Sequence, residues 1–218
     1  MNVTRLKYNL KNQNVFFTSD WHLFHSKVIK YSNRPFKTWQ GMNEAIRDAH
    51  NKLVSKDDIC FNLGDAVLIP SSCMSTAVNR VIYEQYAIDI LSSFNGQIKY
   101  CVGNHEKHLD LLIPQFELIS PLAECVVTDE DDTSQEIVLC HYGLRSWNRQ
   151  HYGSWMLHGH SHGSLMDDNG NNMNDHPHSL ILDVGVDNHP TFSPYSFSEV
   201  KKIMGKKIFK SNDHHKGK

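Results

Sequence analysis

Short apolar runs along the chain each end in a cluster of polar residues. Val15-Phe16-Phe17-Thr18 leads into Ser19-Asp20-Trp21-His22, and further runs of this kind occupy residues 58–63, 97–102, 136–140 and 155–157. Runs of about four to eight residues rich in Val, Ile and Phe are typical of buried β-strands. The pattern therefore predicts strands that carry polar side chains at their carboxyl ends.

Two longer segments between these runs carry apolar residues at spacings of three and four. The first, from Thr38 to Leu53, contains Trp39, Met42, Ala45, Ile46, Ala49 and Leu53. The second, from Cys73 to Phe94, contains Ala77, Val78, Val81, Ile82, Ile88 and Leu91. Such spacing is typical of an amphipathic helix. Strands that alternate with helices predict an α/β fold, in which sites form at the carboxyl ends of the strands.

Polar segments indicate where the chain turns. The acidic residues 129–132 lie between two apolar stretches and predict a hairpin turn, and the Gly- and Asn-rich residues 166–178 predict a loop between two strands. No internal repeat and no Ser- or Pro-rich linker divides the chain. We therefore expect a single domain over residues 1–205, followed by a Lys-rich C-terminal tail over residues 206–218.

The composition and net charge indicate which partners, which cysteine-based sites and which location to expect. The 218 residues include 22 Lys and Arg against 24 Asp and Glu, so the net charge of −2 provides no broad basic surface for nucleic acid. Five cysteines without a CxxC pair argue against a cysteine-based zinc site or a disulfide framework. The N-terminal residues lack the apolar core of a signal peptide, and no apolar stretch approaches the roughly 20 residues that span a bilayer. We expect no membrane partner and a cytoplasmic location.

The 15 histidines are the most informative part of the composition, because histidine is the commonest metal ligand. Several of them follow the predicted strands in the motifs Asp20-x-His22, Gly64-Asp65, Gly103-Asn104-His105, His141 and Gly159-His160-x-His162. Alternation along a strand would place the two polar residues of each x-separated pair on the same side. Carboxylate, amide and imidazole groups without a thiolate suit Mn²⁺, Fe²⁺, Zn²⁺ or Ni²⁺.

The number of candidate ligands points to two ions rather than one. The candidates are Asp20, His22, Asp65, Asn104, His141, His160 and His162. Seven ligands are too many for one tetrahedral site but suit two ions that share a carboxylate. Two ions about 3.5–4 Å apart can hold a hydroxide and bind a phosphoryl group. His105 is then left to protonate the leaving oxygen.

The five motifs, in this order, resemble the calcineurin-like metallophosphoesterases, whose pattern is D-x-H, GD, GNH[DE], H and GH-x-H. The match runs from Asp20 to His162. The resemblance implies a four-layer α/β/β/α sandwich of two mixed sheets, with two metal ions at its upper edge. It further implies His105 as the catalytic histidine. The first implied metal set is Asp20, His22, Asp65 and His162; the second is Asp65, Asn104, His141 and His160.

Other segments make the resemblance more specific. Residues 19–25, 33–36, 141–148 and 184–187 resemble a small bacterial and phage branch of the family, which implies the cytoplasm of a bacterium or of a phage-infected host cell. Ala66-Val67-Leu68 follows the GD motif in place of the acidic residues of the protein Ser/Thr phosphatases. The chain also lacks the large cap domain of extracellular nucleotidases. Both departures argue against phosphoprotein and periplasmic substrates.

The resulting expectation is a dimetal phosphoesterase, with Mn²⁺ as the preferred ion, that hydrolyses a small phosphodiester. Aromatic residues near the motifs, namely Trp21, Tyr142 and Trp147, favour a nucleotide-like substrate. A phosphomonoesterase or nucleotidase is one alternative, and a non-catalytic, metal-stabilised binding scaffold is another. Nucleic acid is a possible substrate but is not favoured, because the charge balance offers no basic groove.

Four residues near the motifs are candidates for substrate binding. Arg34 and Arg145 could hold a phosphate through two hydrogen bonds each, although a surface ion pair would explain either residue as well. Trp147 could stack on a base, or it could be a packed core residue. His25 follows His22 by three residues and could contact substrate, or it could be an ordinary surface histidine.

Overall fold

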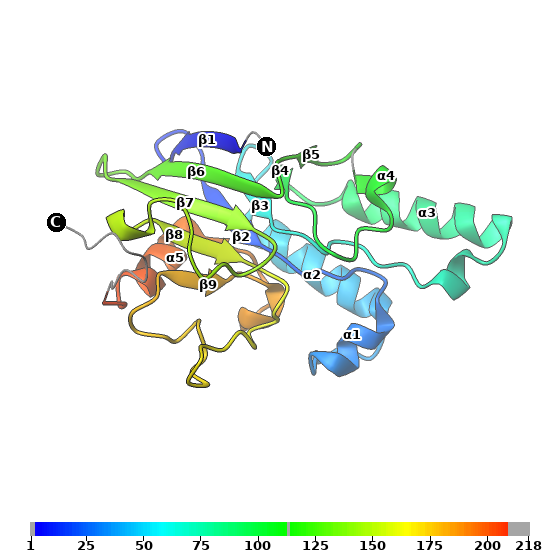
Figure 1. The fold of residues 1–218 in the computed structure, drawn as a ribbon. Helices are drawn as coiled ribbons and strands as arrows, with labels where there is room; N and C mark the ends of the chain where they lie inside the picture. The colour runs from blue at the N-terminus through cyan, green and yellow to red at the C-terminus, as the bar shows by residue number, and fades with distance from the viewer. Residues whose placement is uncertain (1–2, 113, 209–218) are drawn as a thin grey trace.

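Two five-stranded β-sheets face each other in the computed structural model, which describes residues 3–112 and 114–208 (Figure 1). The first sheet has the order β1 (Thr4–Asn9), β6 (Leu122–Thr128), β7 (Ser134–Cys140), β8 (Trp155–His158) and β9 (Ile181–Asp183). Only the β6–β7 pair is antiparallel among these neighbours. This pair forms the predicted hairpin around residues 129–132.

The second sheet contains the predicted strands that precede Asp20, Asp65 and Asn104. Its order is β10 (Tyr195–Ser196), β2 (Val15–Thr18), β3 (Ile59–Asn62), β4 (Gln97–Tyr100) and β5 (Glu117–Leu118). All neighbours are parallel except β10 and β2. The prediction of an α/β fold with two mixed sheets is therefore confirmed. Beyond the ends of β2 and β9, a parallel bridge between Ser19 and Gly185 joins the two sheets at one edge.

Helices fill the connections between the strands. They are α1 (Ser26–Tyr31), α2 (Trp39–Leu53), α3 (Ala77–Leu91), α4 (Leu109–Leu112) and α5 (Phe197–Met204), with short 3₁₀ turns η1 (Ser71–Met74), η2 (Gln150–Tyr152) and η3 (Val186–Asn188). The predicted helix at 38–53 is confirmed as α2. The segment 73–94 instead divides into the end of η1 and the helix α3, because the Thr76 hydroxyl accepts a hydrogen bond from the Asn79 N–H and starts a new helix there.

Two hydrophobic cores lie on opposite faces of the second sheet. Phe17 and Phe61 point between the sheets, where their rings stack with centroids 5.6 Å apart. Phe16 and Cys60, one position earlier on each strand, pack against helical residues such as Met42. This alternation follows from the two-residue period of a strand. Both faces of the second sheet are therefore buried, and this fixes the strands that carry the polar motifs.

The structure differs from the predicted four layers on the far side of the first sheet. Within the described ranges, α5 contributes Phe197, Val200 and Met204 to the core between the sheets instead of covering that far face. The far face carries charged residues, including Arg5, whose side chain is 61% exposed and lies 2.6 Å from Glu124. A helix packed there would have to remove these charges from water, which is costly.

The remaining predictions concern loops and the C-terminal tail. Residues 166–178 connect β8 to β9, as predicted. The described start of the tail is packed, since Lys207 Nζ donates to the carbonyl of Ile181 at 2.7 Å and the Ile208 N–H donates to the carbonyl of Pro177 at 2.6 Å. The rest of the predicted tail, 209–218, lies outside the described residues. No helix in the described part of the chain has the length and hydropathy needed to cross a membrane.

Candidate metal centre

All seven candidate ligands follow the carboxyl ends of strands that meet at one edge of the sandwich. The second sheet supplies the residues after β2, β3 and β4, and the first sheet supplies those after β7 and β8. The structure brings together Asp20, His22, Asp65, Asn104, His141, His160 and His162.

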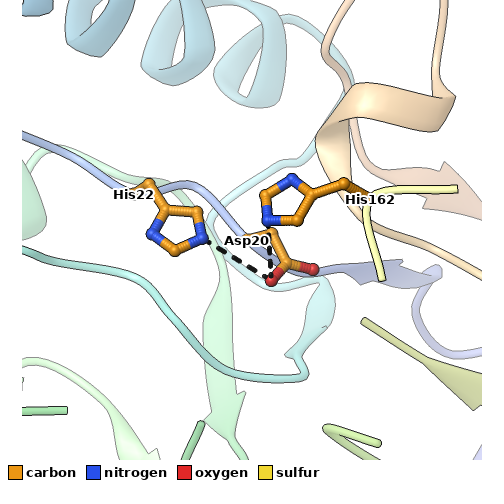
Figure 2. A group of neighbouring side chains, drawn as sticks. All are labelled: Asp20, His22 and His162. Carbon is orange, nitrogen blue, oxygen red and sulfur yellow. Dashed lines mark ion pairs between the residues drawn. The ribbon is translucent and has the colours of Figure 1, made fainter. Parts of the chain in front are cut away.

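The first set of donor atoms centres on Asp20. Its Oδ1 lies 3.8 Å from His22 Nε2 and 4.0 Å from His162 Nε2, and both imidazoles face the carboxylate in Figure 2. His22 Nε2 also lies 3.7 Å from Asp65 Oδ2. Ligand atoms about 2.0–2.2 Å from one ion are separated from each other by roughly these distances. The four side chains can therefore hold a single divalent ion.

A second set of donor atoms begins at the same oxygen of Asp65. His141 Nε2 lies 3.6 Å from Asp65 Oδ2 and 2.9 Å from Asn104 Oδ1. Asn104 Oδ1 also lies 2.8 Å from His160 Nδ1. Asp65 Oδ2 is thus within reach of both sets, as a carboxylate shared by two ions requires.

The first set fits a cation because three of its buried polar atoms lack hydrogen bonds. Among the described residues, Asp20 Oδ1 and both ring nitrogens of His22 have no hydrogen-bond partner. Burial raises the pKa of Asp20 to about 8 and holds the pKa of His22 well below its ordinary value. Polar groups buried without partners cost free energy, and a bound cation would offset this cost. The donor chemistry and the burial therefore both fit divalent metal ions.

Five of the candidate ligands adopt left-handed backbone conformations. Positive φ angles occur at Asp20 (58°), His22 (49°), Asp65 (55°), His160 (68°) and His162 (46°). The paired motifs do not continue their strands, because β2 ends at Thr18 and β8 ends at His158. The expectation of simple strand alternation is therefore wrong for the two pairs, although each pair still converges. Left-handed non-glycine residues cost about 1–3 kcal/mol each and gather at functional sites.

Two glycines of the motifs leave room for the carboxylates. A Cβ at Gly103 would lie 2.2 Å from Asp65 Oδ1, and one at Gly159 would lie 2.4 Å from Asp20 Oδ2. Both distances are far below van der Waals contact. The glycines in the sequences Gly-Asn-His and Gly-His-x-His are therefore required by the close approach of a neighbouring ligand.

Arg34 and Asp187 hold residues of the first donor set in place through hydrogen bonds. Asp187 Oδ2 accepts a 2.5 Å hydrogen bond from His162 Nδ1, and Arg34 donates to both oxygens of Asp187 at 2.7 and 2.8 Å. Arg34 also donates to the carbonyl oxygens of Asp20 at 2.7 Å and Trp21 at 2.9 Å. The prediction that Arg34 binds substrate is wrong, because its side chain is 0% exposed and its donors are already engaged.

Asp187 is a functional residue that the sequence reasoning missed. Burial opposes its ionisation, but the hydrogen bonds from His162 and Arg34 hold the pKa of Asp187 below its ordinary value. As a carboxylate it accepts a hydrogen bond from the Nδ1–H of His162, which leaves the lone pair of His162 Nε2 available to bind a metal. A signal was present, since Asp187 ends one of the segments that resemble the bacterial and phage branch.

Two further acidic residues that the sequence reasoning did not assign hold the ligand loops. Glu106 Oε1 accepts hydrogen bonds from the N–H of Asp65 at 2.6 Å and from the hydroxyl of Tyr100. Asp183 Oδ2 accepts from the Ser161 hydroxyl at 2.7 Å and from the Gly163 N–H at 2.8 Å. Glu106 therefore fixes the shared ligand, and Asp183 fixes the loop that carries His160 and His162.

The candidate catalytic residue His105 lies beside the donor sets without belonging to them. Its backbone N–H donates to Asp65 Oδ1 at 2.8 Å, and the residue lines the cavity over the candidate metal centre. His25 lines the same cavity, with its ring centroid 5.4 Å from that of His22 and 6.4 Å from that of His105. Burial lowers the pKa of His25 to about 4, so its imidazole is neutral near pH 7. The structure thus brings both predicted residues to the site.

The other predicted substrate contacts lie elsewhere. Arg145 is exposed, pairs with Asp168 at 3.0 Å and lines a separate cavity. Trp147 is 8% exposed and donates its indole N–H to the carbonyl of Ser154 at 3.1 Å, so the prediction that it stacks on a base is wrong. Trp21 is buried against Phe94.

Of the aromatic residues expected near the motifs, Tyr142 alone is exposed at the site. It is 46% exposed, and its ring centroid lies 4.7 Å from that of His160.

Similarity to known proteins extends over most of the chain. No protein-family model matches it. The chain is 27% identical over 154 residues to the uncharacterized protein MJ1445 of Methanocaldococcus jannaschii, a match that covers 71% of this chain and 72% of that protein. Its fold is similar to the crystal structure of AQ665, a protein of unknown function from Aquifex aeolicus. That similarity has a TM-score of 0.61 at 19% identity and covers 88% of this chain and 100% of the other. Neither of these two proteins is named with an activity, so the family resemblance stays a prediction.

Proposed function

We propose that the protein is a dimetal-dependent phosphoesterase that hydrolyses a small, nucleotide-like phosphodiester. One observation carries the proposal: Asp65 Oδ2 lies 3.7 Å from His22 Nε2 and 3.6 Å from His141 Nε2, between two donor sets of oxygen and imidazole nitrogen. A shared carboxylate between two such sets is the arrangement that two-metal phosphoryl hydrolases use.

The chain offers a complete set of ligands for two divalent ions. Asp20, His22, Asp65 and His162 would hold the first ion, and Asp65, Asn104, His141 and His160 the second. Mn²⁺ is the preferred ion, and Fe²⁺, Zn²⁺ or Ni²⁺ also suit these ligands. When bound, two such ions would polarise the phosphoryl oxygens and lower the pKa of an attacking water.

The protein itself supplies orientation and a proton. The hydrogen bond from the backbone N–H of His105 to Asp65 Oδ1 keeps this histidine beside the shared ligand. The bond leaves the imidazole free, and His105 lines the cavity. A protonated His105 would give its proton to the leaving oxygen as the phosphoester bond breaks. Neutral His25, on the same side of the cavity, is available to hydrogen-bond the substrate.

The test compares a diester with a monoester on the same protein. Metal-stripped protein is resupplied with Mn²⁺ and assayed with bis-p-nitrophenyl phosphate and with p-nitrophenyl phosphate. We expect Mn²⁺-dependent cleavage of the diester. Cleavage of the monoester alone would instead support phosphatase or nucleotidase activity, and cleavage of neither, with no bound ion, would favour the non-catalytic scaffold.

A matched variant makes the test specific to the candidate site. Asp65→Asn should abolish turnover, because the amide cannot serve as a charged ligand to two ions. Asp168→Asn is the control, since Asp168 is 78% exposed in a surface pair with Arg145. Normal turnover by Asp65→Asn would rule out the two-metal proposal.

A further inference from the structure

The cavity above the metal centre is much larger than a phosphoryl group requires. It has a volume of about 800 Å³, and its floor includes His22, Asp65, His160 and His162. It extends from these residues along α1 on one side and along residues 164–166 on the other. Cavities of about 300–1,000 Å³ accommodate whole organic ligands. Most of this space must therefore be available to the group that the phosphate carries.

A row of rings lines one wall of the cavity. The centroid of His22 lies 5.4 Å from that of His25, and the centroid of His25 lies 6.4 Å from that of Tyr31 at the end of α1. Tyr31 is 73% exposed, although large aromatic side chains usually bury more of their surface. The wall thus leads from a metal ligand to an exposed aromatic ring.

The opposite wall also presents apolar surface. Met166 is 52% exposed, and Leu165 lines the cavity as a partly buried residue. Methionine side chains adapt to flat ligand surfaces and make favourable contacts with aromatic rings. An aromatic group inside the cavity could therefore contact Tyr31 on one side and Met166 on the other.

The charge of the cavity limits how many phosphates the ligand carries. Among the described lining residues, Lys27 is the one permanently charged cation. Arg34 is engaged by Asp187, and Arg145 lies at a different cavity. Polyphosphates and nucleic acid strands are held by several lysines or arginines. This cavity suits a ligand with one phosphoryl group.

We infer that the cavity is a subsite for an uncharged aromatic group, aryl or nucleoside, attached to a single phosphoryl group, and that Tyr31 and Met166 determine this specificity. The inference rests on the proposed function, because it places the phosphoryl group at the metal centre. It names the substrate class for that site, and it excludes polyphosphates and nucleic acid strands.

Binding of phosphonates tests the subsite without turnover. Isothermal titration of the Mn²⁺-loaded protein would compare methylphosphonate, phenylphosphonate and 4-biphenylphosphonate, which extend progressively further along the wall. We expect the affinity to rise along the series, by about tenfold or more from methyl to biphenyl, since each ring buries apolar surface. The double variant Tyr31→Ala/Met166→Ala should lose most of this gain and bind methylphosphonate as the wild type does.

Tyr152→Ala is the matched control, because Tyr152 is also 73% exposed but lies on η2, away from this cavity. The Tyr152→Ala variant should keep the full rise in affinity from methylphosphonate to 4-biphenylphosphonate. Equal affinities along the series in the wild type, an unchanged gain in the double variant, or no binding of any phosphonate would overturn the inference. A protein that prefers biphenylphosphonate but cleaves no ester would contradict the proposed function and leave the subsite standing.

Discussion

His162 and Asp187 are joined by a 2.5 Å hydrogen bond from the imidazole Nδ1 to the carboxylate Oδ2. The bond selects one tautomer of His162 and directs its Nε2 toward Asp20 Oδ1, 4.0 Å away. Arg34 fixes Asp187 and also binds the backbone of Asp20, so a single guanidinium connects two ligands of the first donor set. The position of this set therefore depends on two residues that lie outside it.

Asp187→Asn should weaken metal binding at the first set. The amide of asparagine lacks the negative charge of Asp187. Its NH₂ group can also donate to His162 Nδ1, which would place the ring proton on Nε2, the nitrogen needed for the metal. Loss of such a supporting carboxylate lowers metal affinity by about 10- to 100-fold. Titration with Mn²⁺ measures the change, and the second ion should bind with its normal affinity.

The control for this variant is a second carboxylate–arginine pair on the same chain. Asp168 pairs with Arg145 at 3.0 Å, but both side chains are mostly exposed. Asp168→Asn should leave Mn²⁺ binding unchanged, because exposed ion pairs contribute little. Equal affinities in Asp187→Asn and the wild type would show that His162 needs no support from Asp187.

Removal of Asp20 and removal of Asp65 should have different effects on the number of bound ions. In the proposed assignment Asp20 is a ligand of the first ion alone, although its carboxylate also lies within 4.8 Å of donor atoms of Asp65 and His141. Asp65 Oδ2, in contrast, lies 3.7 Å from His22 Nε2 and 3.6 Å from His141 Nε2. We expect Asp20→Asn to retain one ion and Asp65→Asn to retain none after gel filtration. Metal analysis by mass spectrometry measures both numbers, and two ions in Asp65→Asn would contradict the shared ligand.

His105→Ala should separate catalysis from metal binding. The ring of His105 is outside both donor sets, so we expect the variant to keep its metal content. Loss of a general acid typically lowers the rate by about 10²- to 10⁴-fold. The loss should be smaller for p-nitrophenyl esters, whose leaving group needs little protonation, than for alkyl esters. A uniform loss across leaving groups would argue against proton donation by His105.

His50 should make the stability of the fold depend on pH below neutrality. It is 1% exposed, and burial lowers its pKa to about 4 from an ordinary value of 6.5. The unfolded chain therefore binds this proton more readily. The stabilising contribution is complete above pH 6.5 and is lost as the pH falls to about 4, by about 3 kcal/mol at roughly 1.4 kcal/mol per pKa unit.

The variant His50→Gln isolates this effect. Glutamine can still donate to the carbonyl of Asn95, which lies 2.9 Å from His50 Nε2, but it does not titrate. Urea unfolding of the metal-free proteins at pH 7 and at pH 4 would show a smaller loss for the variant. A loss equal to that of the wild type would mean that His50 is protonated in the folded state without cost.

The sequence was sufficient to predict the convergence of the donor residues. The motifs follow parallel strands, and parallel strands present their carboxyl ends at one edge of a sheet. Asp20, Asp65 and Asn104 meet at this edge because β2, β3 and β4 are neighbours in the sheet. The apolar spacing of residues 38–53 was equally direct, because a long amphipathic pattern has few alternatives to a helix.

Roles that depend on tertiary contacts could not be predicted in the same way. Arg34 and Arg145 look alike in the sequence, and only the position of Asp187 decides that one is buried and the other exposed. Trp147 packs in the core, where its indole N–H donates a hydrogen bond to the carbonyl of Ser154. The left-handed conformations of Asp20 and His22 arise from hydrogen bonds to Gly64 and Asp65, which are more than forty positions away.

The spread of the donor residues along the chain has a consequence for synthesis on the ribosome. Asp20 and His22 emerge early, but His162 emerges some 140 residues later, and Asp187 follows it. A nascent chain that ends before Asp187 therefore lacks the carboxylate that orients His162. On the proposed function, a metal ion at the first set could be held firmly only after translation of nearly the whole chain, when the two sheets have joined at Ser19 and Gly185.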